Sequence, residues 1–134
     1  MLAIDRNPAH LRELADEAAS RDLPIAPVRA DLESAPAPPL ASGRCGALLV
    51  FRFLHRPLAP ALVEALRPGG LLLYETFTCH QRELSQRPRN PAFLLEEGEL
   101  PRLFSELETI EAWEGTTEGP RPTALARLVA RRPL

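Results

Sequence analysis

One stretch of the sequence, residues 47–77, constrains the fold of this chain more than any other. Residues 47–51 are continuously apolar, which is typical of a central parallel strand covered on both faces, and residues 71–77 predict a second buried strand. Between them, residues 58–66 read as a helix that ends at the Arg-Pro-Gly-Gly segment 67–70. The stretch therefore predicts a strand, a helix and a second strand parallel to the first.

The N-terminal segment predicts another strand that leads directly into a helix. Residues 2–4 are apolar and end at Asp5, and Asn7 then supplies a helix cap, followed by Pro8 at the first helical position. Apolar residues recur at three- and four-residue spacing in the segment that follows, while polar residues fill the other face. We expect an amphipathic helix that packs on one side.

A second short strand is expected at residues 23–28, and its prolines place it at a sheet edge. It ends at the segment Arg29-Ala30-Asp31, so a carboxylate again follows a strand. The segment 34–46 is rich in proline and is expected to be an irregular loop that can include a helical turn.

The C-terminal part predicts a helix and then two strands. Apolar residues at positions 100, 103, 104 and 107 mark an amphipathic helix. Strands are expected at residues 109–114 and 124–130, and the Gly- and Pro-rich connection between them is too short for a helical crossover, so this pair should be antiparallel. The whole pattern predicts an α/β fold with a doubly wound, mostly parallel sheet and a C-terminal antiparallel hairpin. A length of 134 residues with 45% hydrophobic residues fits one domain.

Composition excludes several classes of protein. The formal charge is -2, and the 16 basic residues are interspersed with 18 acidic ones, so nothing favours nucleic-acid binding. Cys45 and Cys79 have neither a CxxC spacing nor a histidine cluster, which argues against a disulfide framework and against a metal site. No apolar run approaches the ~20 residues that span a bilayer, and the N-terminus lacks the pattern of a secretory leader. We expect a cytoplasmic protein with no membrane partner.

The order of these elements resembles class I S-adenosylmethionine-dependent methyltransferases. The segments FRFLHRPL at 51–58, LRPGGLLLYETF at 66–77, RPRNPAFLL at 87–95 and GEL at 98–100 look closest to small bacterial methyltransferases of the tellurite-resistance type. The resemblance covers nearly the whole chain. It implies a Rossmann-like methyltransferase sheet and S-adenosylmethionine as the cofactor.

The sequence departs from this family at its beginning. The first 42 residues contain no glycine, so the family's first strand and the glycine-rich loop that holds the methionine end of the cofactor have no counterpart. We therefore expect an N-terminally truncated methyltransferase-like domain over residues 1–134 that starts at the family's second strand.

The resemblance nominates cofactor-binding residues at the strand ends. Asp5, with Arg6 beside it, stands where the family binds the ribose hydroxyls, a task that suits a carboxylate because it accepts two hydrogen bonds from a diol. The alternative for Asp5 is capping of the next helix. Asp31 and Leu32 stand where the family contacts adenine, and the alternative there is an exposed loop aspartate.

The residues that follow the apolar strand line the floor beneath the sulfonium in the family. The matching positions here are Phe51 and Arg52 for the cofactor and Phe53 for the substrate, with Leu54 beside them. The alternative for the apolar members is simple core packing.

His55 and Glu75 are the candidate catalytic residues. His55 follows the central strand, where its near-neutral pKa would suit deprotonation of a methyl acceptor, although a helix-start role is the alternative. Glu75 lies in an otherwise apolar strand and on the opposite face from Tyr74. A buried carboxylate needs a partner, so an ion pair with Arg52 or Arg56 is the preferred account of Glu75.

A proline-stiffened loop supplies the remaining candidates. Arg87, Arg89 and Asn90 could contact an anionic substrate, as could Arg56, because arginine binds carboxylates and other oxyanions well. A solvated loop is the alternative.

Two functions follow from the sequence. The first is an S-adenosylmethionine-dependent methyltransferase-like protein that acts on a small molecule, with no turnover expected from these 134 residues alone. The second is a non-catalytic interaction module in which the sheet edge left by the absent strand is covered by a partner or by self-association, for example in a homodimer.

Overall fold

The computed structural model describes residues 1–34, 40–84 and 86–134. The chain divides into two compact units, Met1–Pro39 and Leu40–Leu134, which we call the N-terminal unit and the C-terminal unit. Each unit is described by itself. The prediction that residues 1–134 make one domain stays a prediction.

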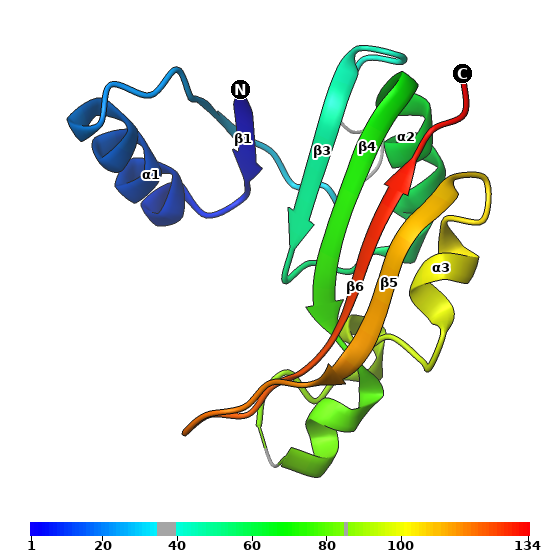
Figure 1. The fold of residues 1–134 in the computed structure, drawn as a ribbon. Helices are drawn as coiled ribbons and strands as arrows, with labels where there is room; N and C mark the ends of the chain where they lie inside the picture. Colours follow the sequence, from blue (N-terminus) through cyan, green and yellow to red (C-terminus); the bar gives the residue numbers. More distant parts are fainter. Residues whose placement is uncertain (35–39, 85) are drawn as a thin grey trace. The chain divides into compact units, whose positions relative to one another are not determined.

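The N-terminal unit is a strand, a helix and a parallel strand (Figure 1). Strand β1 (Leu2–Asp5) leads into helix α1 (Pro8–Ser20), and strand β2 (Ala26–Arg29) returns parallel to β1, with Asp5 opposite Arg29. The side chain of Asn7 caps α1 by accepting a hydrogen bond of 2.9 Å from the amide of Ala9, as the sequence predicted. Strand β2 begins three residues later than predicted, because the chain first turns after α1.

The C-terminal unit contains a four-stranded sheet in the order β3-β4-β6-β5 (Figure 1). Its strands are β3 (Cys45–Phe51), β4 (Leu66–Phe77), β5 (Glu108–Thr116) and β6 (Ala124–Arg131). Strand β3 runs parallel to β4, whereas β6 is antiparallel to both β4 and β5. The predicted parallel unit and the predicted antiparallel hairpin are both confirmed.

Strand β4 begins earlier than the sequence predicted. The Arg-Pro-Gly-Gly segment was expected to end a helix, but Leu66 already pairs with Cys45, and the register then shifts before Ala47. Gly69 makes this irregularity feasible because its φ is +77°, a conformation that residues with a side chain rarely adopt. The segment is therefore a bulged start of β4.

In the described residues of the C-terminal unit, two short helices and three 3₁₀ turns connect the strands. The predicted helix over 58–66 is present as a 3₁₀ turn followed by α2, whereas the helix expected to reach residue 107 ends four residues earlier. There the chain turns so that the amide of Leu107 bonds to the carbonyl of Phe104, and both side chains become buried. The elements are η1 (Arg56–Leu58), α2 (Ala59–Ala65), η2 (Cys79–Leu84), η3 (Pro91–Phe93) and α3 (Glu99–Leu103).

The core of the C-terminal unit lies on one face of the sheet. Figure 1 shows α2 and α3 on the same side of the strands. Leu72, Tyr74 and Thr76 stand at alternate positions of β4 and are buried. The ring of Tyr74 lies 5.4 Å from that of Phe104, centroid to centroid. Burial of these apolar groups against the helices fixes the face of β4 that points inward.

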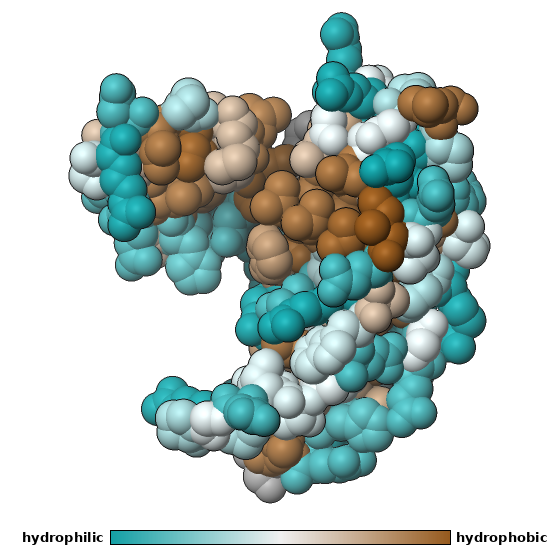
Figure 2. Space-filling view, viewed as in Figure 1, coloured by the Kyte–Doolittle hydropathy of each residue, from teal (hydrophilic) through white to brown (hydrophobic). Residues whose placement is uncertain are grey.

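The other face of this sheet carries apolar side chains that remain accessible. Leu49 is 56% exposed and Phe51 is 55% exposed, so the expectation of a strand covered on both faces is wrong for β3. In the C-terminal unit, the helices that the structure describes pack on the opposite side of the sheet. Figure 2 shows a continuous hydrophobic surface over β3 and β4. We call this surface the open face; its apolar members are Ala47, Leu49, Phe51, Leu71, Leu73 and Val129.

The predicted irregular loop at 34–46 is only partly visible. Residues 35–39 lie outside the described residues, and the last two positions of the predicted loop already belong to β3.

Candidate functional site

An open hollow lies at the C-terminal ends of β1 and β2 in the N-terminal unit. Because the two strands are parallel, the residues that follow them meet at the same edge of the sheet. The hollow has a volume of about 620 Å³. It is lined by Arg6, Asn7, Arg29, Ala30 and Asp31. Two residues predicted to bind the cofactor, Arg6 and Asp31, are therefore brought together.

Asp5 lies beside this hollow and is held by the start of α1. Its Oδ1 accepts a hydrogen bond of 2.8 Å from the amide of Asn7, and its Oδ2 lies 3.2 Å from Nδ1 of His10. The bond from Asn7 is the main reason why the pKa of Asp5 is lowered, so the side chain is a carboxylate at neutral pH. Its side chain remains 41% exposed.

Asp5 is not the N-cap residue of α1, which was the alternative to its ribose role. The side chain of Asn7 caps the helix by accepting a hydrogen bond from the amide of Ala9. Asp5 instead accepts a hydrogen bond from the amide of Asn7. A carboxylate has about four lone-pair sites, so these contacts leave Asp5 able to accept hydrogen bonds from a diol. The ribose role remains a prediction that this geometry permits.

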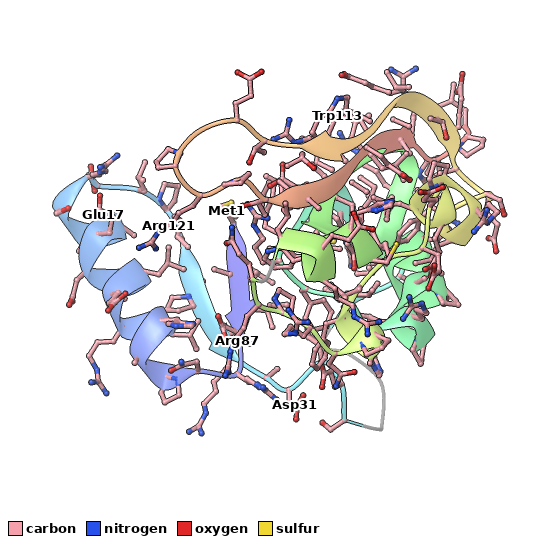
Figure 3. The ribbon with its side chains drawn as sticks, turned by 90° about the horizontal axis from the view of Figure 1, so that it is seen from below. Met1, Glu17, Asp31, Arg87, Trp113 and Arg121 are labelled. Atoms are coloured by element: carbon pink, nitrogen blue, oxygen red, sulfur yellow. The ribbon has the colours of Figure 1, made fainter. Side chains whose placement is uncertain are left out.

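Asp31 lies in the exposed turn that follows β2 (Figure 3). Its Oδ1 accepts a hydrogen bond of 3.0 Å from the amide of Glu33, and Leu32 beside it is half-buried. The turn fixes the direction of the carboxylate at the rim of the hollow. Adenine contact by Asp31 and Leu32 stays a prediction.

Sequence reasoning missed three residues of this region. Asn7 and Arg29 line the hollow although they were read only as a cap and a strand end, and His10 contacts Asp5 although it was assigned to the polar face of the helix. The signal for His10 was its position in the first turn of α1, directly after the strand that ends at Asp5.

In the C-terminal unit, the ends of β3 and β4 form a charged cluster. Arg52 has an unusual φ of +55°, and its amide bonds to the backbone carbonyl of Glu75 at 2.9 Å. Its guanidinium lies 3.4 Å from the Glu75 carboxylate and 4.8 Å from the ring centroid of Phe77. The predicted ion pair of Glu75 with Arg52 is confirmed.

Glu75 has a second partner that the sequence did not indicate. Arg127, on β6, donates from Nε to the Glu75 carboxylate and stacks 4.7 Å from the ring of Trp113 on β5. Charges therefore alternate from Arg52 through Glu75 to Arg127, and an aromatic ring lies against each arginine. This row lies on the same face as the apolar surface of Figure 2. Only the pairing of β6 with its two neighbours reveals this contact.

Arg56, the other proposed partner of Glu75, pairs elsewhere. Its Nε and Nη2 donate to the two carboxylate oxygens of Glu99 at 2.6 and 2.8 Å, and Nη1 and Nη2 also bond the carbonyls of Ala92 and Leu94. This pairing lowers the pKa of the Glu99 carboxyl. The proposed Arg56–Glu75 pair is wrong, because Arg56 instead ties η1 to α3 and to the segment before it.

The residues between Arg52 and Arg56 are held by the core. The carbonyl of Phe53 accepts a 2.7 Å hydrogen bond from the Tyr74 hydroxyl, and burial raises the pKa of that hydroxyl. Leu54 is buried, while His55 is half-buried and stands at the start of η1. The structure therefore shows a helix-start position for His55, and its role as a base stays a prediction.

Two side-chain hydrogen bonds hold the proline-stiffened loop at residues 87–91. Nε2 of the buried Gln81 donates to the carbonyl of Arg87 at 3.0 Å, and the side chain of Asn90 caps η3 by accepting from the amide of Ala92. Arg87 and Arg89 are exposed. Substrate contact by this loop stays a prediction.

Within residues 1–34, 40–84 and 86–134, no three or more His, Cys, Asp or Glu side chains gather closely enough to bind a metal ion. In those ranges, no helix is both long enough and apolar enough to cross a membrane. Cys45 and Cys79 are free thiols.

The two units together define a class of fold. A strand–helix–strand unit, then parallel strands joined by a helix, then an antiparallel hairpin is the Rossmann-like fold of class I S-adenosylmethionine-dependent methyltransferases. The predicted fold class is therefore confirmed.

Individual solved structures make this likeness specific. TehB from Haemophilus influenzae matches 98% of this chain and 49% of its own, with a TM-score of 0.75 and 16% identity. A S-adenosylmethionine-dependent methyltransferase from Methanosarcina mazei matches 99% of this chain and 82% of its own, with a TM-score of 0.75 and 15% identity. The N-methyltransferase NodS from Bradyrhizobium japonicum matches 99% of this chain and 73% of its own, with a TM-score of 0.70 and 17% identity.

These matches define the fold and leave the reaction open. The [4+2]-cyclase SpnF has the same fold with a TM-score of 0.71 at 14% identity, so this architecture also hosts other chemistry. The chain spans about half the length of the TehB structure. No protein-family model matches the sequence, and no curated protein does.

Proposed function

We propose that this chain is a methyltransferase-like protein whose N-terminal unit binds the nucleoside part of S-adenosylmethionine and which acts on a small molecule. The observation that supports the proposal is the placement of Asp5 and Asp31 at the C-terminal ends of two parallel strands, beside an open hollow that Asp31 lines together with Arg6 and Asn7, the two residues after Asp5. Ligands of open α/β sheets bind at such strand ends. Two solved structures with this fold, from Methanosarcina mazei and Aquifex aeolicus, are S-adenosylmethionine-dependent methyltransferases.

The residues in and beside this hollow fit a nucleoside. Asp5 is ionised and partly exposed, so it can accept hydrogen bonds from a ribose diol, and Asp31 can accept from the exocyclic amine of adenine. Arg6 and Arg29 add positive charge beside the two carboxylates. When bound, S-adenosylmethionine would supply an electrophilic methyl group.

The methionine end of the cofactor has less support. The first 42 residues contain no glycine, so the N-terminal unit has no glycine-rich loop through which its backbone could closely approach the ligand. The proposal is therefore nucleoside binding by this chain. For methyl transfer we propose His55 as the base and Arg87 and Arg89 as contacts for the methyl acceptor.

Isothermal titration calorimetry with S-adenosylmethionine tests the proposal. We expect saturable binding that weakens about tenfold in Asp5→Asn, because a hydrogen bond to a charged acceptor is worth about 1.5–3 kcal/mol. Asp5→Asn keeps the oxygen that accepts from Asn7, and Glu17→Gln, an exposed change on α1, is the matched control. Absence of heat at millimolar ligand would overturn the proposal.

A second candidate function is a non-catalytic interaction module. It is favoured by the open face, on which Leu49 and Phe51 remain more than half exposed, because large apolar surfaces of this kind mark interaction sites. Sedimentation velocity at increasing protein concentration tests for self-association. If the partner is a second copy of this chain, sedimentation should show a dimer at high concentration. Leu49→Lys should then weaken that dimer.

A further inference from the structure

Three residues at the start of α1 form a closed ring of hydrogen-bonding contacts. The amide of Asn7 donates to Oδ1 of Asp5 at 2.8 Å, and Nδ2 of Asn7 lies 3.3 Å from Nε2 of His10. Nδ1 of His10 in turn lies 3.2 Å from Oδ2 of Asp5. All three residues belong to the N-terminal unit. His10 therefore contacts the carboxylate that the proposed function assigns to the ribose diol.

The helix cap fixes which ring nitrogen of neutral His10 carries the proton. Oδ1 of Asn7 accepts the hydrogen bond from the amide of Ala9, so Nδ2, which can only donate, is the atom that faces His10. Nε2 of His10 must then accept, and a neutral imidazole with this nitrogen as its acceptor carries its proton on Nδ1. Neutral His10 therefore donates from Nδ1 to Oδ2 of Asp5 and holds the carboxylate in one direction.

A second proton on His10 would change both of its contacts. The new N–H at Nε2 would face Nδ2 of Asn7, and two donors cannot bond each other. The contact with Asp5 would become an ion pair, because Asp5 is a carboxylate whose pKa is lowered mainly by the hydrogen bond from the amide of Asn7. A carboxylate that shares its charge with an imidazolium is a weaker acceptor for a neutral diol.

His10 is the group at this end of the unit that changes charge near neutral pH. The charged groups around it are Asp5 and Arg6 at the end of β1, Glu13 on α1, and Arg29 and Asp31 at the end of β2. Carboxylates and arginines keep their charge between about pH 5 and pH 8, the range in which histidine titrates. A change in ligand binding over this range should therefore follow the protonation of His10.

We propose that His10 is a positioning residue of the nucleoside site: it holds the Asp5 carboxylate in place when it is neutral and weakens nucleoside binding when it is protonated. This inference rests on the proposed nucleoside binding and adds its regulation by pH. It involves only contacts inside the N-terminal unit.

NMR titrations of the intact protein with adenosine and with dideoxyadenosine, which lacks the ribose diol, test the inference. Both ligands are neutral at about pH 5 and at about pH 8, the limits of the range in which histidine changes charge. Adenosine should bind about fivefold more weakly at the lower pH, because a hydrogen bond to a charged acceptor is about twice as strong as one to a neutral acceptor. Dideoxyadenosine should bind more weakly than adenosine at the higher pH and should show no pH effect.

His10→Asn is the variant that separates positioning from a purely structural role. Its Nδ2 can take the place of Nδ1 as the donor to Asp5, and it cannot gain a proton. The histidine side chain is 63% exposed, so the change removes little packing. We expect His10→Asn to bind adenosine like the wild type at about pH 8 and to keep this affinity at about pH 5, whereas His10→Ala should bind more weakly at both. His80→Asn, the matched change in the C-terminal unit, should keep the wild-type pH profile.

Three results would overturn the role of His10. They are a pH effect that persists in His10→Asn, a pH effect of equal size with dideoxyadenosine, and nitrogen NMR spectra that place the proton of neutral His10 on Nε2. Adenosine binding without a pH effect would likewise remove the role of His10 and keep the nucleoside proposal. If neither adenosine nor S-adenosylmethionine binds, the nucleoside proposal is wrong and the role of His10 is overturned with it.

Discussion

The pair of Arg56 and Glu99 offers a sharp test of how the C-terminal unit is held together. Two parallel hydrogen bonds of 2.6 and 2.8 Å join the guanidinium to the carboxylate, and the same guanidinium bonds the carbonyls of Ala92 and Leu94. One side chain thus connects η1 with the segment that leads into α3. Replacing Arg56 by Ala should loosen this connection and lower the free energy of unfolding.

The expected size follows from the burial of the two partners. The side chains of Arg56 and Glu99 are 36% and 15% exposed. Exposed pairs contribute up to about 1 kcal/mol, while breaking a fully buried pair costs about 3–5 kcal/mol. We therefore expect a coupling free energy of about 1.5 kcal/mol between Arg56 and Glu99 in the double-mutant cycle of their alanine variants. Arg56→Ala alone should lower the free energy of unfolding by about 2.5 kcal/mol, because the carbonyls of Ala92 and Leu94 also lose a donor.

Urea unfolding followed by tryptophan fluorescence measures this loss. The chain has 1 tryptophan, Trp113, which lies on β5, so the signal reports the C-terminal unit (Figure 3). The matched control is Arg82→Ala, an exposed charge removal on η2 of the same unit, which should change the unfolding free energy by less than about 0.5 kcal/mol. A coupling below about 0.5 kcal/mol would refute the reasoning, because the pair would then behave as an ordinary surface pair.

The same pair predicts a pH dependence. Arg56 lowers the pKa of the Glu99 carboxyl below its usual value of 4.5. Because the pKa of Glu99 is lower in the folded than in the unfolded state, the ion pair stabilises the fold fully above the unfolded-state pKa. This stabilisation is lost as the pH falls through the folded-state pKa. The difference between the wild type and Arg56→Ala should therefore narrow as the pH falls below 4.5. A difference that stays constant down to the acid transition would contradict the assignment.

Two further predictions concern the same unit. Gly70→Ala should lower the free energy of unfolding in urea by at least about 2 kcal/mol, because a Cβ there would lie 2.9 Å from the carbonyl oxygen of Cys45. Gly46→Ala should lower it less, because a Cβ there meets only a flexible arginine side chain. Equal losses in the two variants would contradict this reasoning. The two ring nitrogens of His80 contact the carboxylates of Glu83 and Glu97 at 3.0 and 2.7 Å, and these contacts raise the pKa of the histidine. The charged histidine therefore stabilises the fold at low pH, and this stabilisation is lost as the pH rises through the pKa of the folded state. The NMR titration midpoint of His80 should fall in Glu97→Gln, and an unchanged midpoint would show that the contact does not persist in solution.

The candidate residues show where sequence reasoning succeeded and where it stopped. Glu75 was expected to need a basic partner because burying a lone carboxylate is costly, and Arg52 provides one. The second partner, Arg127, lies 52 positions along the chain from Glu75. No local pattern indicates which residue of β6 lies opposite a given residue of β4, because the register follows from packing of the whole sheet.

The roles of the arginines were the hardest to assign. Arg56 carries the same charge as Arg52 and lies four residues from it, so the sequence could not distinguish the two as partners of Glu75. In the structure, Arg52 ends β3 with a φ of +55° and faces Glu75, whereas Arg56 begins η1 and faces Glu99. The direction of each side chain depends on the backbone path after the strand, which local sequence does not specify.

The sequence by itself determined the type and order of the elements. Apolar periodicity, the Asn-Pro helix start and the Gly- and Pro-rich connection before β6 are local signals, and each acts within a few residues. Such signals were sufficient for the parallel unit, the antiparallel hairpin and the carboxylates that follow β1 and β2.

Only the tertiary structure decided which faces are buried and which charges meet. Strand β3 reads as fully buried because all its residues are uncharged, yet Leu49 and Phe51 are exposed. Burial depends on which other elements pack against a strand, and those elements are distant in sequence. The pairing of strands likewise decided that Glu75 joins Arg52 and Arg127, because contact between side chains far apart in the chain exists only once the sheet has formed.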